Sequence, residues 1–177
     1  VEDFSDEDGG FYIGSKDAEK LMVRAKDSFD SAIPSGNSVA AMNLFRLGKM
    51  TGNTKWTRLG EKTLKAFTEQ AKQSPNGFSF MLTAFMFNQK NSKELVIVSN
   101  GLDEKTEDAI KRVKDTYAPN MITLFKDMSK PSLLEEIAPW TKAHSLMDNK
   151  PTFYLCEDFS CKRPTTNIKT VLNYLNE

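Results

Sequence analysis

The sequence predicts an α+β fold in which helical hairpins come first and a small α/β module follows. Between residues 38 and 87, apolar side chains recur at helical spacing. After residue 91, two β-rich runs flank an amphipathic helix at the spacing of a βαβ unit, and a third β-rich run follows. The predicted domains are therefore residues 1–91 and residues 92–177, the second with a short, mostly parallel sheet.

The first predicted domain begins with a turn. GGFYIG, residues 9–14, predicts a turn followed by a short strand, because paired glycines precede aromatic and β-branched residues. Residues 17–26 fit either a short helix or an extended arm. Helices are predicted at 38–48, 54–73 and 78–87; the first and third are apolar nearly all round, and the second is amphipathic.

This alternation predicts inner, outer and inner helices of a layered α/α array, because a helix that is apolar on all sides must be covered on all sides. Three helices do not cover two inner ones. The cover therefore comes from the rest of this chain or from the missing part of a larger protein. In the second case, we expect the isolated chain to form a homodimer through the helical layer or to expose an apolar patch.

The second predicted domain holds three strands and two helices. The strands are ELVIVSNG (94–101), MITLFK (121–126) and PTFYLC (151–156). The helix at 104–117 lies between the first two strands, and the helix at 167–176 closes the chain. A strand, a helix and a strand in this order favour parallel pairing.

Composition excludes several classes of function. Lys plus Arg and Asp plus Glu both number 24, so no electrostatic reason exists to expect nucleic acid or an anionic membrane surface. The sequence contains no run of about eighteen apolar residues, so it predicts no membrane span. The acidic N-terminus lacks a signal-peptide core, and two cysteines cannot hold a disulfide-rich secreted scaffold, so we expect a reducing, cytoplasmic location. The missing initiator Met indicates processing or a fragment of a longer protein.

The polar loop before residue 38 is the first candidate site. One interpretation is an ordinary helix cap at Asn37 or Ser38. The other is a pocket for a polyhydroxylated or anionic ligand, such as a sugar, in which the loop supplies hydroxyl, amide and charged groups. On this interpretation the ligand-binding residues are Arg24, Lys26, Ser35, Asn37 and Ser38. Asp30 and Asp27 are the candidate catalytic residues, Asp30 being preferred because Phe29 and Ile33 would raise its pKa.

The remaining reactive side chains give weaker indications. Cys156 ends an apolar strand, which favours a buried structural thiol, with a regulatory disulfide to Cys161 as the alternative. Two thiolates fill half of a zinc tetrahedron, so no metal site and no other cofactor is expected. His144, the single histidine, is expected to be solvated or locally hydrogen-bonded. SNGLDEKTED (99–108) lacks the glycines of a phosphate-binding loop, so nucleotide binding has no support.

Five segments of the chain belong together: DEDGGFY, RAKDSFDSAIPSGNSVAAMNLFRLGKMTG, ELVIVSNG, Tyr117-Ala-Pro-Asn and FYLCEDFSCKRPTT. In this order they resemble the C-terminal part of the thioredoxin-domain-containing family that includes spermatogenesis-associated protein 20. The resemblance covers almost all of the chain. Where the family has an asparagine between its two cysteines, this chain has Asp158.

The resemblance implies a larger architecture. Family members join an N-terminal thioredoxin-like domain to an α/α barrel similar to N-acylglucosamine 2-epimerases and six-hairpin glycosidases. Residues 1–91 would then be the last helices of the barrel, and the rest of the barrel and the thioredoxin-like domain would be its partners. The first expectation is a fragment of a carbohydrate-processing or carbohydrate-binding protein. The alternative is a non-catalytic scaffold or partner-binding module that supports a thioredoxin-like redox domain. Epimerase-type histidines have no counterpart here, and a shared fold does not imply a shared function.

Overall fold

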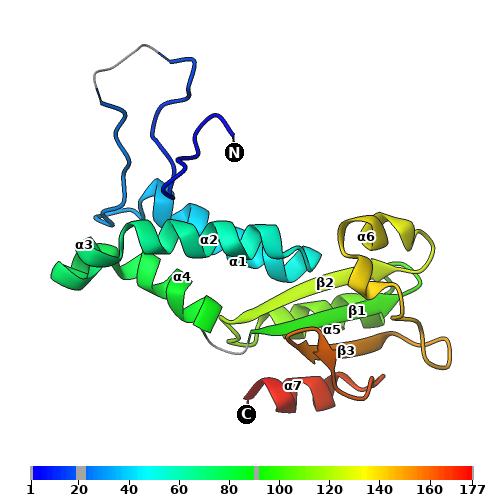
Figure 1. The fold of residues 1–177 in the computed structure, drawn as a ribbon. Coiled ribbons are helices and arrows are strands. Elements are labelled where there is room, and N and C mark those ends of the chain that lie inside the picture. The colour runs from blue at the N-terminus through cyan, green and yellow to red at the C-terminus, as the bar shows by residue number, and fades with distance from the viewer. Residues whose placement is uncertain (1, 19–22, 90–91, 177) are drawn as a thin grey trace. The chain divides into compact units, whose positions relative to one another are not determined.

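The computed structural model describes residues 2–18, 23–89 and 92–176. It divides into two compact units, which we describe separately: Val1–Gly48 with Asn53–Lys90, and Lys49–Gly52 with Asn91–Glu177. Over the described ranges the chain forms seven α-helices and one mixed four-stranded sheet (Figure 1). The predicted α+β class is therefore confirmed.

The first unit is helical. Asn53 caps the helix that follows it, because its Oδ1 accepts a hydrogen bond of 3.0 Å from the Lys55 amide. The helix predicted at 54–73 is two helices, since the backbone leaves the helical conformation at Phe67. The elements are α1 (Gly36–Thr51), α2 (Thr54–Ala66), α3 (Thr68–Gln73), the 3₁₀ turn η1 (Pro75–Phe78) and α4 (Ser79–Gln89).

The segment before α1 contains no strand within its described residues. The strand predicted after residues 9–10 is wrong, because Phe11 forms only a single antiparallel bridge with Ser5. Of the alternatives for residues 17–26, the helix finds no support at 17–18 or 23–26, and residues 19–22 lie outside the described ranges.

Helices α1 and α2 approach closely where a glycine replaces a side chain. A Cβ atom on Gly60 of α2 would lie 2.7 Å from the Phe45 ring of α1. The two helices can therefore come this close only because residue 60 has no side chain. Helix α4 buries Met81, Ala84 and Phe87. Its Leu82, Phe85 and Met86 side chains are 38%, 48% and 50% exposed, so this helix is apolar all round and covered on one side.

The second unit is built on the sheet. β1 is parallel to β2 and antiparallel to β3, and β3 is antiparallel to β4, in the order β2-β1-β3-β4. The expected mostly parallel sheet is thus mixed, because β3 enters from the opposite end and turns back in a tight hairpin. The elements are β1 (Lys93–Ser99), α5 (Glu104–Lys114), β2 (Met121–Asp127), α6 (Ser132–Ile137), the 3₁₀ turn η2 (Pro139–Thr141), β3 (Thr152–Glu157), β4 (Ser160–Cys161) and α7 (Ile168–Asn176).

The two faces of this sheet have different covers. Leu95 and Ile97 of β1 pack with residues of α5 and α7, which lie along one face (Figure 1). Val96 and Val98 point to the opposite face and pack with Tyr154, Trp140 and the segment after β2. We call this second side the His144 face. None of the helices in the described ranges is long and apolar enough to cross a membrane.

A buried lysine organises the His144 face. Lys126 of β2 is 1% exposed, and its Nζ donates to the carbonyl oxygens of Thr141 at 2.9 Å and of His144 at 2.8 Å. The same ammonium pairs with the Glu135 carboxylate at 2.7 Å. A buried charge is tolerated only when it is fully partnered, and these contacts supply partners from three places in the chain.

We expect Lys126→Met to destabilise the second unit by about 3 kcal/mol, because the change leaves buried carbonyl oxygens without a donor. Urea unfolding followed by Trp140 fluorescence, in a Trp56→Phe background, measures this. The matched control is Lys142→Met, at an exposed position of the same segment. Equal stability of the two variants would contradict the role given to Lys126.

Candidate functional site

Asp30, the preferred catalytic candidate, lies at the amino end of α4. Its Oδ2 accepts hydrogen bonds from the amides of Phe80 at 2.8 Å and Met81 at 3.1 Å, and its Oδ1 accepts one from Ser35 at 2.8 Å. The side chain therefore caps a helix whose first amides have no partner within the helix. Its backbone amide also donates to the Gly77 carbonyl oxygen at 2.7 Å.

The expected rise in the pKa of Asp30 is wrong. Burial pushes this pKa upward, as predicted from Phe29 and Ile33, but the hydrogen bonds from Ser35, Ser38, Met81 and Phe80 together outweigh burial and hold it below its ordinary value. Asp30 is therefore an ionised acceptor at neutral pH. A general acid needs the opposite shift.

The other polar side chains of the loop also form hydrogen bonds within the chain. Asn37 is 2% exposed: its Oδ1 accepts from the Phe11 amide, and its Nδ2 donates to the carbonyl oxygens of Phe11 and Asp27. Ser35 Oγ lies 2.9 Å from Ser38 Oγ and accepts from the Ser38 amide at 3.2 Å, which caps α1. The structure therefore brings Asp30, Ser35 and Ser38 together, and it places Asn37 against the Phe11 segment.

The charged candidates lie in the segment that precedes this loop. Arg24 donates to the carbonyl oxygens of Asp3 and Gly14, and Lys26 donates to Gly9 and pairs with Asp6. Asp27 is exposed. A hollow of about 600 Å³ runs beside Asp27 and Asn37; apolar and aromatic side chains dominate its lining, including Phe4, Phe11, Tyr12 and Leu44. A role of these residues in ligand binding or catalysis stays a prediction.

The two cysteines of the second unit form a disulfide, so the expected free thiol at Cys156 is wrong. Cys156 and Cys161 are register partners in the β3–β4 hairpin. Their approach depends on the two residues at the turn, Asp158 and Phe159, which both have positive φ. Non-glycine residues take this conformation infrequently, so a two-residue turn at Asp158 and Phe159 was not the leading prediction. Cys156 is fully buried, as predicted, and Cys161 is exposed.

His144 lies beside this disulfide and is 7% exposed, so of the two expected states, solvated or locally hydrogen-bonded, the solvated ring is wrong. Its Nε2 is 3.5 Å from Cys161 Sγ. The ring stacks on Tyr154 with centroids 4.2 Å apart and meets Trp140 edge-on at 5.6 Å. Burial, and then the charge of Lys126, lower the pKa of His144 from its ordinary value of 6.5, so the ring is neutral at pH 7. Its Nδ1 has no hydrogen-bond partner among the described residues.

A buried carboxylate lies on the same face. Glu94 of β1 is the register partner of Cys156 and is fully buried. Its Oε2 accepts from the Phe159 amide at 3.1 Å, and its Oε1 is 3.7 Å from Lys49 Nζ. Burial raises the pKa of Glu94 above its ordinary value, although the Phe159 amide and Lys49 oppose the rise. Lys49 also pairs with Asp158 in the hairpin turn.

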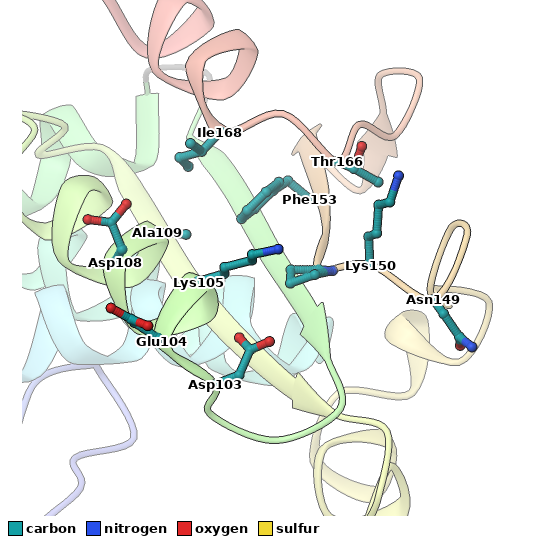
Figure 2. Close-up of a pocket in the computed structure, with 11 residues that line it drawn as sticks. Asp103, Glu104, Lys105, Asp108, Ala109, Asn149, Lys150, Phe153, Thr166 and Ile168 are labelled. Carbon is teal, nitrogen blue, oxygen red and sulfur yellow. The ribbon is translucent and has the colours of Figure 1, made fainter.

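A second hollow in this unit lies at the carboxyl end of β1, where open α/β sheets commonly bind ligands. Figure 2 shows three of the residues that line this hollow: Lys105 of α5, Lys150 before β3, and Phe153 of β3. The volume is about 590 Å³. Asp103, Glu104 and Asp108 surround the amino end of α5, so their charges already complement the helix dipole and disfavour an anion there.

Sequence reasoning missed His144 because its neighbours come from distant segments. Cys161 is 17 residues away and Lys126 is 18 residues away. The cysteine spacing alone did not indicate a third group. The arrangement joins a disulfide that has one exposed cysteine to a neutral imidazole, which is a combination suited to thiol chemistry.

We expect Asp30→Ala to destabilise the first unit by about 2 kcal/mol, because three amides lose an ionised acceptor. Since its pKa is lowered in the folded state, the wild-type contribution is present above the unfolded value of 3.8 and is lost as the pH falls. Urea unfolding followed by Trp56 fluorescence, in a Trp140→Phe background, measures both effects. Asp27→Ala is the control, with a change within about 0.5 kcal/mol; similar losses for both variants would contradict the capping role.

Comparison with known proteins gives relatives of much greater length. No protein-family model matches the chain. The human and rat proteins named spermatogenesis-associated protein 20 are each 32% identical to it over 167 residues, which is 93% of this chain and 21% of theirs. An uncharacterised protein of Caenorhabditis elegans is 23% identical over 170 residues. The chain has homologues named spermatogenesis-associated protein 20 and spans about a fifth of their length.

Proposed function

We propose that the helical first unit of this chain is a non-catalytic scaffold segment of a larger protein related to spermatogenesis-associated protein 20. In this proposal the exposed side of α4 packs against further helices of that protein. The observation that carries the proposal is the apolar side of α4, where Leu82, Phe85 and Met86 remain 38–50% exposed. Burial of a large apolar side chain is worth about 1.5–3 kcal/mol, so covering this side would contribute substantially to stability.

The contacts of the polar loop favour this scaffold role over catalysis. The Asp30 carboxylate accepts three backbone hydrogen bonds, and the Asn37 amide makes three more. These groups fix the start of α1 and α4, and a bound sugar would have to compete with the bonds already made. Carbohydrate processing by Asp30 and Asp27, and the α/α barrel that the resemblance implies, stay predictions.

The relatives are much longer than this chain, and the rest of such a protein is the partner that we propose for α4. The region matched by this chain is 21% of the human protein, so four-fifths of that protein lies outside the match. Helices from that remainder are the occupant to which the proposal commits. A second copy of this chain is the competing occupant, and its binding would appear as a homodimer.

For the second unit, we infer a thioredoxin-like topology. The support is the strand order β2-β1-β3-β4, with one parallel and two antiparallel pairs, and the placement of α5 and α7 on the same face. The amino end of α5, where a redox pair of cysteines would be expected in such a domain, follows Asn100-Gly101-Leu102-Asp103 and carries no cysteine. This unit therefore would not act as an ordinary thioredoxin.

A chimera tests the scaffold proposal. The matched region of the human relative is replaced by this chain, and amide hydrogen exchange of residues 79–89 is compared with that of the isolated chain. We expect exchange to slow by roughly tenfold or more in the chimera, because covered helices open less often.

Phe85→Glu should remove that added protection, and Lys65→Glu, at an exposed position of α2, should leave it intact. Equal exchange in the chimera and the isolated chain would sink the proposal. Protection that appears in the isolated chain as its concentration rises would instead assign this side of α4 to a homodimer.

A further inference from the structure

We propose that Cys156–Cys161 is a redox-active disulfide, in which Cys161 is the sulfur that exchanges with a partner thiol and His144 is its proton acceptor. The site consists of these three residues. A ring nitrogen of His144 and the two sulfur atoms lie within 4.8 Å of one another, and His144 Nε2 is 3.5 Å from Cys161 Sγ. The chemical class of the partner is a dithiol, or its disulfide in the reverse direction.

The two cysteines differ in exposure in the way that exchange requires. Cys161 lies in β4, a two-residue strand whose residues are both exposed. Cys156 is fully buried in β3. An incoming thiolate therefore reaches only Cys161, and Cys156 is placed to leave and later to resolve the mixed disulfide.

The histidine is held in position for this role. Tyr154 stacks on one side of the ring, Trp140 meets its edge, and Lys126 fixes the backbone through the His144 carbonyl oxygen. The ring is neutral at pH 7, so it can accept the proton of a Cys161 thiol. A positioned base next to an exposed thiol is the usual way in which proteins raise thiolate reactivity.

The disulfide has a small structural role. It joins residues five apart that the β3–β4 turn already brings together. The loss of chain entropy on cross-linking increases with loop length, so this bond lies near the lower end of the stabilising range. Exposed disulfides are in general the ones that exchange readily.

The exchange balances without a further reactant. A thiolate of the partner dithiol attacks Cys161 Sγ, the bond to Cys156 breaks, and Cys156 leaves as a thiolate that takes up a proton. The second partner thiol gives its proton to His144 and attacks the partner sulfur in the mixed disulfide, and the Cys161 thiolate that is released takes up that proton. The partner has become a disulfide, and two electrons have passed to the cysteine pair. In the reverse direction, His144 takes the proton from the Cys161 thiol before Cys161 attacks.

Charged groups around the site bear on its reactivity. Lys126 pairs with Glu135 and donates to the His144 carbonyl oxygen. Lys49 pairs with Asp158 in the hairpin turn and lies 3.7 Å from the Glu94 carboxylate. Lys162 follows Cys161 directly. A test must therefore separate the action of His144 from a general effect of nearby charge.

Alkylation of single-cysteine variants provides that test. Cys156→Ser and Cys161→Ser of the 177-residue chain are treated with iodoacetamide at pH 7 in the presence of a metal chelator. We expect Cys161 to react at least roughly tenfold faster than Cys156. Adding His144→Gln to Cys156→Ser should slow Cys161 by roughly tenfold, and adding Lys162→Gln should change the rate by less than about twofold. Equal rates for the two cysteines, or equal slowing by both added changes, would overturn the proposal.

The unmodified chain gives a second readout that does not depend on the fold of any variant. Reduction by dithiothreitol without denaturant is followed by mass spectrometry. In a parallel sample, a small monothiol opens the disulfide and iodoacetamide alkylates the cysteine that is released, which traps the mixed disulfide. The proposal requires reduction within minutes and a trapped mixed disulfide on Cys161. A disulfide that resists millimolar dithiothreitol in the folded protein, or a trapped thiol on Cys156, would contradict it.

Discussion

The buried ammonium group of Lys126 is the constraint on which the His144 face of the sheet depends. It lies on β2, yet its partners are the carbonyl oxygens of Thr141 and His144 and the carboxylate of Glu135, which all come from the segment between β2 and β3. That segment contains little regular structure of its own. Since an unpaired ammonium in this place would be costly, the charge selects one path for the segment over the sheet. The position of His144 follows from that path.

The two units use polar groups in the same way at different places. In the first unit, the Asp30 carboxylate gathers amides from the start of α1 and α4; in the second, Lys126 gathers carbonyl oxygens. Both groups are charged, buried and bonded to backbone, so they specify loops that apolar contacts alone would leave undetermined. The two groups differ in the side chains that lie near them. Only Lys126 holds a segment that brings a reactive pair, His144 and Cys161, within 3.5 Å.

Periodicity was sufficient to predict β1, α5 and β2 and their parallel pairing, because each has one regular pattern and a short connection to the next. The direction of β3 was not predictable in this way, since the long segment before it allows entry from either end of the sheet. The pKa of Asp30 was misjudged because its apolar neighbours are local, whereas two of its donors are fifty and fifty-one residues away. The contact between His144 and Cys161 depends on Lys126 and on the hairpin turn, so no spacing rule contains it.

The single histidine of the chain makes one measurement decisive for this account. In a proton NMR titration, the ring Cε1 proton of His144 gives one resolved signal in the folded protein without any assignment. The account predicts a midpoint below 6.5, because the ring is buried and close to Lys126, and a shift of the signal when dithiothreitol reduces the disulfide. A midpoint at or above 6.5, with a signal that does not respond to reduction, would show that His144 does not lie buried beside Cys161 and would contradict the account.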